Sequence, residues 1–269
     1  MFTFDPNSRY QMPAHFGPRP FPAQSGFRYN DITMMIIPFL TDRERLAAYL
    51  PEPFEVADDA VVTVTYCCNR NVDFLAGRGY NMVSVTAPVI FNGEQETLEG
   101  SFALVTWENL AEPILIGREV QGIPKLYADI QDHSVISGNW HTNASHFGNK
   151  ILDMHISDLR DPSAGEIEAY SKASKGKDNP MGWRYLPGVG GLGEGASEFT
   201  TFPSETTFSS LQIGRGNLKW QHLSWEQNPT QYHIVNALAD LPVVAELPAM
   251  VATASAELVL PDRKTRVIE

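Results

Sequence analysis

The sequence predicts a β-rich α+β fold: a single domain built on an antiparallel sheet that is closed or nearly closed, with a few peripheral helices. Many stretches of the chain are rich in β-branched and aromatic residues, which favour strands. Few stretches have the spacing of an amphipathic helix. The chain has 269 residues, of which 43% are hydrophobic, so it is long enough to bury a large core.

The chain begins with a proline-rich segment. Residues 1–30 hold five prolines and predict an extended N-terminal arm, and residues 31–269 form the predicted domain. A short apolar run at 31–38 follows the arm. Residues 41–50 predict a helix, because Thr41 begins a sequence with capping-box spacing.

The rest of the chain alternates between strands and turns. We expect strands at 60–67, 82–91, 101–107, 125–131, 133–141, 150–157, 204–213, 216–225 and 249–260. Helical spacing predicts a helix at 113–121, ended by Gly122, and another at 231–241. The polar stretch 160–180 predicts an exposed excursion with one or two helical turns.

Charge and composition exclude several classes of partner. The formal net charge of −12 argues against nucleic acid and against an anionic membrane surface. The chain lacks apolar runs of membrane-spanning length, and its start lacks the features of a signal peptide. Cys67 and Cys68 are adjacent and give no disulfide framework. We therefore expect a cytoplasmic protein without a membrane partner.

The motifs that suggest a cofactor are weak. Residues 188–193 match G-x-G-x-x-G, but the residues after them cannot begin a good helix, so they predict a flexible loop and not a dinucleotide site. The histidines lack the spacing of metal ligands on a helix. We expect no cofactor and no metal.

Lys125 has an unusual context. It is the only lysine among the first 149 residues, although eight arginines occur there. Arginine does not lose its proton in a protein, whereas burial lowers the pKa of a lysine and can free its amine. Apolar residues surround Lys125, namely Ile123, Pro124 and Leu126. The alternative is a lysine whose stem lies along a strand edge while its amine reaches water.

The segment "GREVQGIPK", residues 117–125, resembles the G-R-E-x-x-x-x-P-K signature of the acetoacetate decarboxylase family. Flanking stretches at 50–56, 87–93 and 238–261 also resemble that family. The resemblance implies a cone-shaped β-barrel with peripheral helices, assembly into a homo-oligomer of four or more subunits, and Lys125 as the Schiff-base lysine. Acetoacetate decarboxylase is itself the standard example of a lysine activated by a desolvated pocket or a neighbouring cation.

Three positions depart from the pattern of true decarboxylases. The second lysine of the family is replaced by Leu126, and Met82 stands where the family carries a glutamate, two residues after the matched Tyr80. The family's arginine near the first strand aligns with Ile32, although Arg28 is close in sequence. Acetoacetate decarboxylation is therefore less expected than another imine reaction.

Gln121 lies four residues before the lysine, which resembles the branch of the family that performs aldolase, dehydratase or hydratase reactions on 2-oxo acids. A neutral amide can hold a substrate carboxylate or hydroxyl. Arg118 either supplies positive charge to the substrate or pairs with Glu119 or Glu108. Tyr80 is either a proton donor or a packing residue of its strand.

The sequence thus predicts a Schiff-base-forming lyase that acts on a small keto acid, most of all by aldol or dehydration chemistry on a 2-oxo acid such as pyruvate. Lys125 and Tyr80 are the expected catalytic residues, and Gln121, Arg118 and Met82 are the expected substrate-binding residues. One alternative is a β-keto acid decarboxylase, and another is a barrel that binds a ligand without catalysis.

Overall fold

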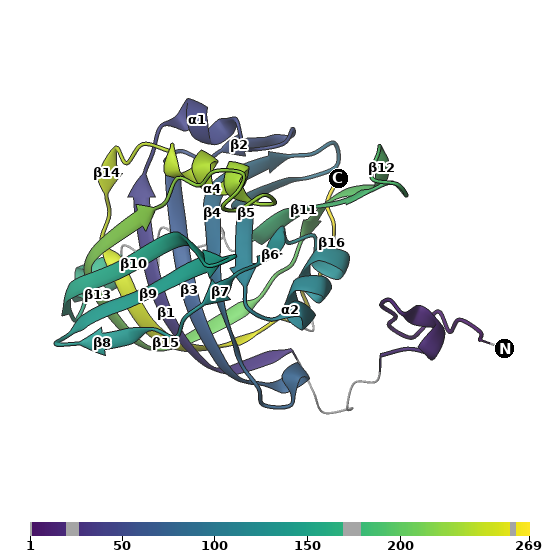
Figure 1. Cartoon of the computed structure of the whole chain (residues 1–269), viewed down its shortest axis with the longest axis horizontal. Coiled ribbons are helices and arrows are strands. Elements are labelled where there is room, and N and C mark those ends of the chain that lie inside the picture. Colours follow the sequence, from purple (N-terminus) through teal and green to yellow (C-terminus); the bar gives the residue numbers. More distant parts are fainter. Residues whose placement is uncertain (1, 20–26, 169–178, 259–261) are drawn as a thin grey trace.

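The computed structural model describes residues 2–19, 27–168, 179–258 and 262–269. Figure 1 shows a large, strongly curved sheet with a few short helices at its margins. The predicted strand-rich fold with few helices is confirmed. Among the described residues, none of the helices is long and apolar enough to cross a membrane.

The strands differ greatly in length. They are β1 Arg28–Leu40, β2 Phe54–Val56, β3 Val61–Val72, β4 Tyr80–Asn92, β5 Thr97–Glu108, β6 Lys125–Tyr127, β7 Asp129–Ile130, β8 Ser134–Ile136, β9 Asn139–His146, β10 Asn149–Arg160, β11 Asn179–Pro187, β12 Glu194–Thr201, β13 Glu205–Trp220, β14 Ala245–Glu246, β15 Ala249–Glu257 and β16 Arg266–Val267. The helices are α1 Arg43–Ala47, α2 Ala111–Ile116 and α4 Tyr232–Ala239. A π-helical turn, Gly117–Gln121, continues α2, and 3₁₀ turns cover Ala14–Phe16 and Asp73–Leu75.

The strands form one sheet, in the order β16-β12-β11-β5-β4-β3-β1-β15-β13-β10-β9-β7. Four short strands pair beside this path, β14 with β1, β2 with β4, β6 with β5 and β8 with β9. Most pairs are antiparallel, but β5 pairs in parallel with both β6 and β11. The sheet is therefore mixed, and its ladder does not close into a barrel.

One short segment lies at the gap where the sheet would have to close to form a barrel. Residues 125–127 pair with β5, and residues 129–130 pair with β9, so the segment from Lys125 to Ile130 touches both sides of the gap. Because each half has only one partner strand, no continuous ladder runs across the gap. Lys125 begins this segment, so the fold places it at the seam of the curved sheet.

The two faces of the sheet have different roles, because side chains alternate along a strand. On β3, Val62, Val64 and Tyr66 face the main hydrophobic core. Cys67 and Asn69, on the opposite face of the same strand, line a cavity. Each fully buried apolar side chain of the core contributes about 1.5–3 kcal/mol relative to exposure, so one face stabilises the fold. The other face borders the cavity.

The first helix is shorter than predicted. Its N-cap is Asp42, whose carboxylate accepts a hydrogen bond of 2.9 Å from the backbone N–H of Arg45, so the expected cap at Thr41 is wrong by one residue. The helix expected at 113–121 exists, but its second half is the π turn. Its predicted end at Gly122 is confirmed, since this residue has a φ of 75°.

Two predictions about the second half of the chain need correction. The strands expected at 204–213 and 216–225 are one strand, β13, because its first part pairs with β15 and its second part with β10. Strands β11 and β12 were not expected, since their sequences are interrupted by polar residues and glycines. Residues 188–193 connect these two strands, so the loop predicted there is confirmed. Residues 164–168 are helical, and 169–178 of the predicted excursion lie outside the described residues.

The N-terminal arm contacts its own chain. Gln11 Nε2 donates a hydrogen bond of 3.1 Å to the Glu119 carboxylate, and the Arg9 guanidinium lies 6.0 Å from the centre of the Phe27 ring. Phe2 and Tyr10 pack against each other at the start of the arm. Assembly into a homo-oligomer, with the arm on a neighbouring subunit, stays a prediction.

Candidate active site

The cavity side of the sheet holds a pocket of about 760 Å³. Alternate residues of neighbouring strands project into it. They are Tyr29, Ile32 and Met34 of β1, Cys67 and Asn69 of β3, Tyr80, Met82, Ser84 and Thr86 of β4, and Thr106 and Glu108 of β5. Lys125 and Gln121 line the same cavity, so the structure brings four of the predicted site residues together: Lys125, Gln121, Tyr80 and Met82.

Lys125 is buried, with 8% of its surface exposed. The helical segment ends at Gly122, and parallel pairing with Thr106 then fixes Lys125 at the start of β6. Its Nζ lies 2.7 Å from Oε1 of Glu108 and donates a hydrogen bond of 3.1 Å to the carbonyl of Pro113. The amine is therefore held inside the protein, as its apolar neighbours predict.

The first glycine of the signature leaves room for this lysine. A Cβ atom on Gly117 would lie 2.5 Å from Cδ and Cε of Lys125 and 2.9 Å from Nζ. The φ of Gly117 is −62°, which any residue can adopt, so the position needs glycine for space and not for backbone freedom. The lysine stem lies directly against the helix backbone.

Gln121 is positioned by the end of the π turn. The backbone N–H of Gly122 bonds to the carbonyl of Gly117, and the Thr200 hydroxyl donates a hydrogen bond of 2.6 Å to the carbonyl of Gln121. These bonds anchor the backbone of Gln121, while its side chain lines the cavity. A π turn of this kind often occurs at functional sites.

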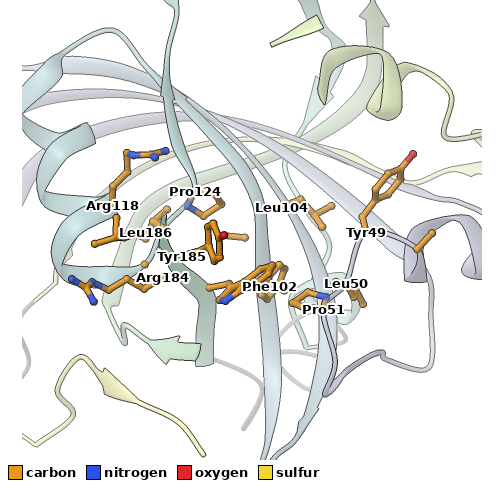
Figure 2. Close-up of a pocket in the computed structure, with 15 residues that line it drawn as sticks. Tyr49, Leu50, Pro51, Phe102, Leu104, Arg118, Pro124, Arg184, Tyr185 and Leu186 are labelled. Atoms are coloured by element: carbon orange, nitrogen blue, oxygen red, sulfur yellow. The ribbon is translucent and has the colours of Figure 1, made fainter. Parts of the chain in front are cut away.

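Arg118 does not line this cavity. Its Nη1 donates a hydrogen bond of 2.9 Å to the backbone carbonyl of Lys125, and its side chain lines a second, smaller pocket of about 450 Å³ (Figure 2). Among the described residues it forms no ion pair with Glu119 or Glu108. The expected contact with substrate is thus replaced by support of the lysine backbone. Arg28 is also outside the cavity, since it pairs with Glu257 at 3.4 Å.

Glu108 is the principal residue that the sequence analysis did not assign to the site. Its side chain is fully buried. Nζ of Lys125 lies 2.7 Å from Oε1, and neither carboxylate oxygen has another partner among the described residues. Burial raises the pKa of Glu108 above its ordinary value, while Lys125 acts in the opposite direction. A buried acid with unsatisfied oxygens is more typical of a functional group than of a structural one.

Glu108 lies beside Met82 in the sheet. The two residues are direct partners across the antiparallel pair β4 and β5. Side chains of such partners lie on the same face of a sheet, about 4.5–5.5 Å apart at Cβ. Glu108 therefore places an acid on the face of the sheet that Met82 also occupies.

Two further polar groups face the cavity. Asn69 is 2% exposed, and its Nδ2 has no hydrogen-bond partner among the described residues, so it can donate to a ligand. The hydroxyls of Tyr80 and Tyr29 lie 2.8 Å apart. Burial raises the pKa of Tyr80 well above its ordinary value, and the neighbouring Tyr29 and Glu108 add to that effect, so Tyr80 keeps its proton.

Comparison with known proteins agrees with this geometry. The sequence model of the family described as acetoacetate decarboxylase (ADC) matches residues 11–257. The chain belongs to the acetoacetate decarboxylase family. An acetoacetate decarboxylase of Burkholderia vietnamiensis is 32% identical over 120 residues, which cover 45% of this chain and 43% of that protein. The chain therefore matches less than half the length of this curated relative.

Solved structures share the fold over nearly the whole chain. The acetoacetate decarboxylase of Legionella pneumophila has a TM-score of 0.72 at 18% identity and covers 94% of this chain and 92% of its own. The enduracididine biosynthesis enzyme MppR, solved in complex with pyruvate, has a TM-score of 0.62 at 13% identity and covers 89% of both chains. At these identities the likeness shows the acetoacetate decarboxylase fold alone.

One group of side chains outside the cavity has the composition of a metal site. Ligand atoms of His141, Asp153 and His155 lie within 4.8 Å of one another. However, Nζ of Lys150 lies 2.8 Å from the Asp153 carboxylate and already balances its charge. This group lies on β9 and β10, away from the family's signature segment, and the cavity residues described above are not part of it.

Proposed function

We propose that the chain is an imine-forming lyase that acts on a keto acid, with Lys125 as the nucleophile. The observation that carries the proposal is the buried contact between the Lys125 amine and the Glu108 carboxylate, inside a cavity that admits a substrate. A lysine nucleophile needs a group within hydrogen-bond reach that takes its proton. Glu108 is that group.

The first step forms the imine. Glu108 holds the proton that Lys125 gives up, and the neutral amine adds to the carbonyl carbon of the substrate. The hydroxyl of the resulting carbinolamine leaves as water together with the proton of Glu108. The products are a cationic imine on Lys125 and a carboxylate on Glu108, so protons and charge balance.

The second step favours a 2-oxo acid. The Glu108 carboxylate takes a proton from the carbon beside the imine, and the resulting enamine attacks an aldehyde to form a carbon–carbon bond. The aldehyde oxygen takes a proton from Glu108 or from Tyr80, and water then releases the product from Lys125. The amides of Gln121 and Asn69 hold the substrate carboxylate by hydrogen bonds. The pyruvate complex of MppR supports keto acid binding in this fold.

A second candidate is a β-keto acid decarboxylase. Glu108 is the direct partner of Met82 and supplies an acid next to the lysine. The curated relatives are named acetoacetate decarboxylases. In this reaction the imine takes the electrons of the bond that breaks as carbon dioxide leaves. The Glu108 carboxylate takes up a proton from solvent and gives it to the enamine carbon, and water then releases the product from Lys125. The absence of the second lysine, at Leu126, places this candidate after the first.

Trapping with borohydride tests both candidates. The enzyme is incubated with acetoacetate, with pyruvate, or with pyruvate and an aldehyde, and is then reduced, and mass on Lys125 is measured while products are followed by NMR. We expect pyruvate to label Lys125 and to give a condensation or dehydration product, with little carbon dioxide from acetoacetate. Lys125→Arg should remove all labelling, because arginine keeps its charge and forms no imine. Rapid release of carbon dioxide from acetoacetate, with pyruvate unreactive, would make the decarboxylase the better candidate. If no keto acid labelled Lys125, both reactions would be wrong and ligand binding without catalysis would remain.

A further inference from the structure

The cavity is larger than a small keto acid requires. Its volume of about 760 Å³ falls in the range of ~300–1,000 Å³ that is typical of pockets for drug-sized ligands. A keto acid of three or four carbons, bound at Lys125 and Glu108, fills only a small part of it. The remaining volume needs another occupant or a longer substrate.

The wall beside the lysine is apolar and aromatic. Phe27, Tyr29 and Phe74 line the cavity and pack on one another, with ring centres 5.3 Å apart for Phe27 and Phe74 and 6.0 Å apart for Tyr29 and Phe74. Ile32, Met34, Ala256 and Leu258 line the cavity and belong to the same hydrophobic cluster as Tyr29 and Phe74. Such a surface stabilises the burial of an aliphatic or aromatic body and offers few partners to a compact polar acid.

Basic residues line the outer part of the cavity. Arg9 and Arg19 come from the N-terminal arm, and Arg263 and Lys264 come from the stretch after β15. All four are exposed or half-buried, whereas Lys125 and its partner are buried, so the four belong to the rim and the pair to the floor.

The charge of this rim differs from that of the whole chain. The formal net charge of the chain is −12, yet Glu108 is the one acidic residue among the described residues that line the cavity. Local positive charge at a mouth of an acidic protein attracts anions to that mouth and not to the rest of the surface.

We infer that the cavity takes an extended carbonyl compound. Its carbonyl reaches Lys125, an aliphatic or aromatic body lies along the wall of Phe27 and Phe74, and an anionic group at its far end lies at the basic rim. The inference rests on the proposed function, since it uses Lys125 as the group that binds the carbonyl. It adds the size, the apolar body and the remote negative charge of the substrate.

The size of the substrate is tested with two methyl ketone acids, levulinate and its ten-carbon homologue with the carboxylate at the far end. Binding is measured by calorimetry on Lys125→Met, which cannot form an imine, and trapping by borohydride is measured on the unchanged protein. We expect the longer acid to bind at least about tenfold more tightly, because each added methylene is buried against the wall. Equal binding of the two acids would overturn the inference.

The remote charge is tested at the rim. The double substitution Arg9→Gln and Lys264→Gln should weaken binding of the longer acid about threefold and leave binding of its neutral amide unchanged, as expected for partly exposed charges. The matched control, Arg215→Gln and Lys219→Gln, changes the same charge on exposed positions of β13 and should have no effect. If the rim variant weakened binding of the amide as much as binding of the acid, the anionic group would be wrong. The same conclusion would follow if the control variant weakened binding of the acid equally.

The two proposals fail in different ways. If pyruvate labels Lys125 but the longer acid binds no better than levulinate, the imine chemistry stands and the extended substrate is wrong. If the longer acid binds tightly to Lys125→Met but no ketone labels Lys125 of the unchanged protein, the extended ligand stands and the proposed lyase is wrong.

Discussion

The segment from Gly117 to Lys125 lines two pockets, and the comparison between them separates chemistry from support. On the cavity side, the buried pair of Lys125 and Glu108 faces the space that a substrate can occupy. On the other side, in the smaller pocket of Figure 2, Arg118 donates to a backbone carbonyl and Arg184 bonds both the carbonyl of Glu119 and the carboxylate of Glu198. These two arginines hold the segment in place. The pair on the cavity side is the one that a substrate can reach.

The residues of the family's signature differ in role in the same way: most of them support the lysine. Gly117 gives the lysine stem its space, Arg118 holds the lysine backbone, and the carbonyl of Pro124 accepts a hydrogen bond of 3.1 Å from the N–H of Thr106. In the proposed reaction, Lys125 is the residue of this segment that carries reacting atoms. A signature can therefore mark a reaction although most of its residues position one side chain.

The largest effect is expected from Glu108→Gln, which keeps the shape of the side chain and removes its ability to take a proton. Imine formation, followed by borohydride trapping, should fall about 10²–10⁴-fold, the usual range for loss of a general acid or base. The control Glu198→Gln removes a carboxylate on the other side of the segment and should change trapping less than about threefold, since its half-buried ion pair with Arg184 lies outside the cavity. Similar trapping rates for the two variants would contradict the role of Glu108.

Gly117→Ala should reduce trapping about 10–100-fold, because the new Cβ displaces Cδ and Cε of Lys125, and a small misplacement of a reacting group has an effect of this order. The backbone of Gly117 is helical, and alanine favours a helix over glycine by about 1 kcal/mol, which offsets part of the crowding. Stability in urea should therefore change by less than about 1 kcal/mol. A large loss of stability, with trapping reduced only in proportion to the unfolded fraction, would contradict this account.

Arg118→Met should reduce trapping about tenfold and lower the free energy of unfolding by about 0.5–1.5 kcal/mol, the contribution of one hydrogen bond, here to the carbonyl of Lys125. Arg184→Met removes hydrogen bonds to Glu119 and Glu198 from the same pocket. It should lower stability by a similar amount and leave trapping unchanged. If both variants lose trapping equally, Arg118 has no special role in positioning the lysine.

Part of this site could be predicted from the sequence. The isolated lysine and the signature predict Lys125, and spacing along one segment predicts Gln121, since both are properties of residues that are close in the chain. Glu108 and Asn69 could not be assigned, because their place depends on which residues are partners across β3, β4 and β5. A glutamate at the inward-facing end of a predicted strand was the one available signal.

The fold shows the same limit. Long strands with β-branched residues, such as β3 and β4, were predicted because alternation is a local property. Strands β11 and β12 depend instead on a parallel contact with β5 and on each other, which polar residues and glycines in their sequences conceal. Arg118 was expected to bind substrate, but it lies outside the cavity. The sequence could not show this, because it does not give the direction of a side chain in a π turn.

The smallest effect concerns stability and pH. Burial raises the pKa of Glu108 above its ordinary value of 4.5, so in the window above that value the folded chain retains a proton that the unfolded chain has lost. Stability therefore falls as pH rises through this window. Lys125 is the influence that lowers the pKa, so in Lys125→Met the window extends to higher pH and the loss is greater, by about 1.4 kcal/mol for each unit of added pKa. Urea unfolding across this window measures the difference. The double variant Glu108→Gln and Lys125→Met lacks the carboxyl group and should lose this dependence, and an equal slope in both variants would show that another group causes it.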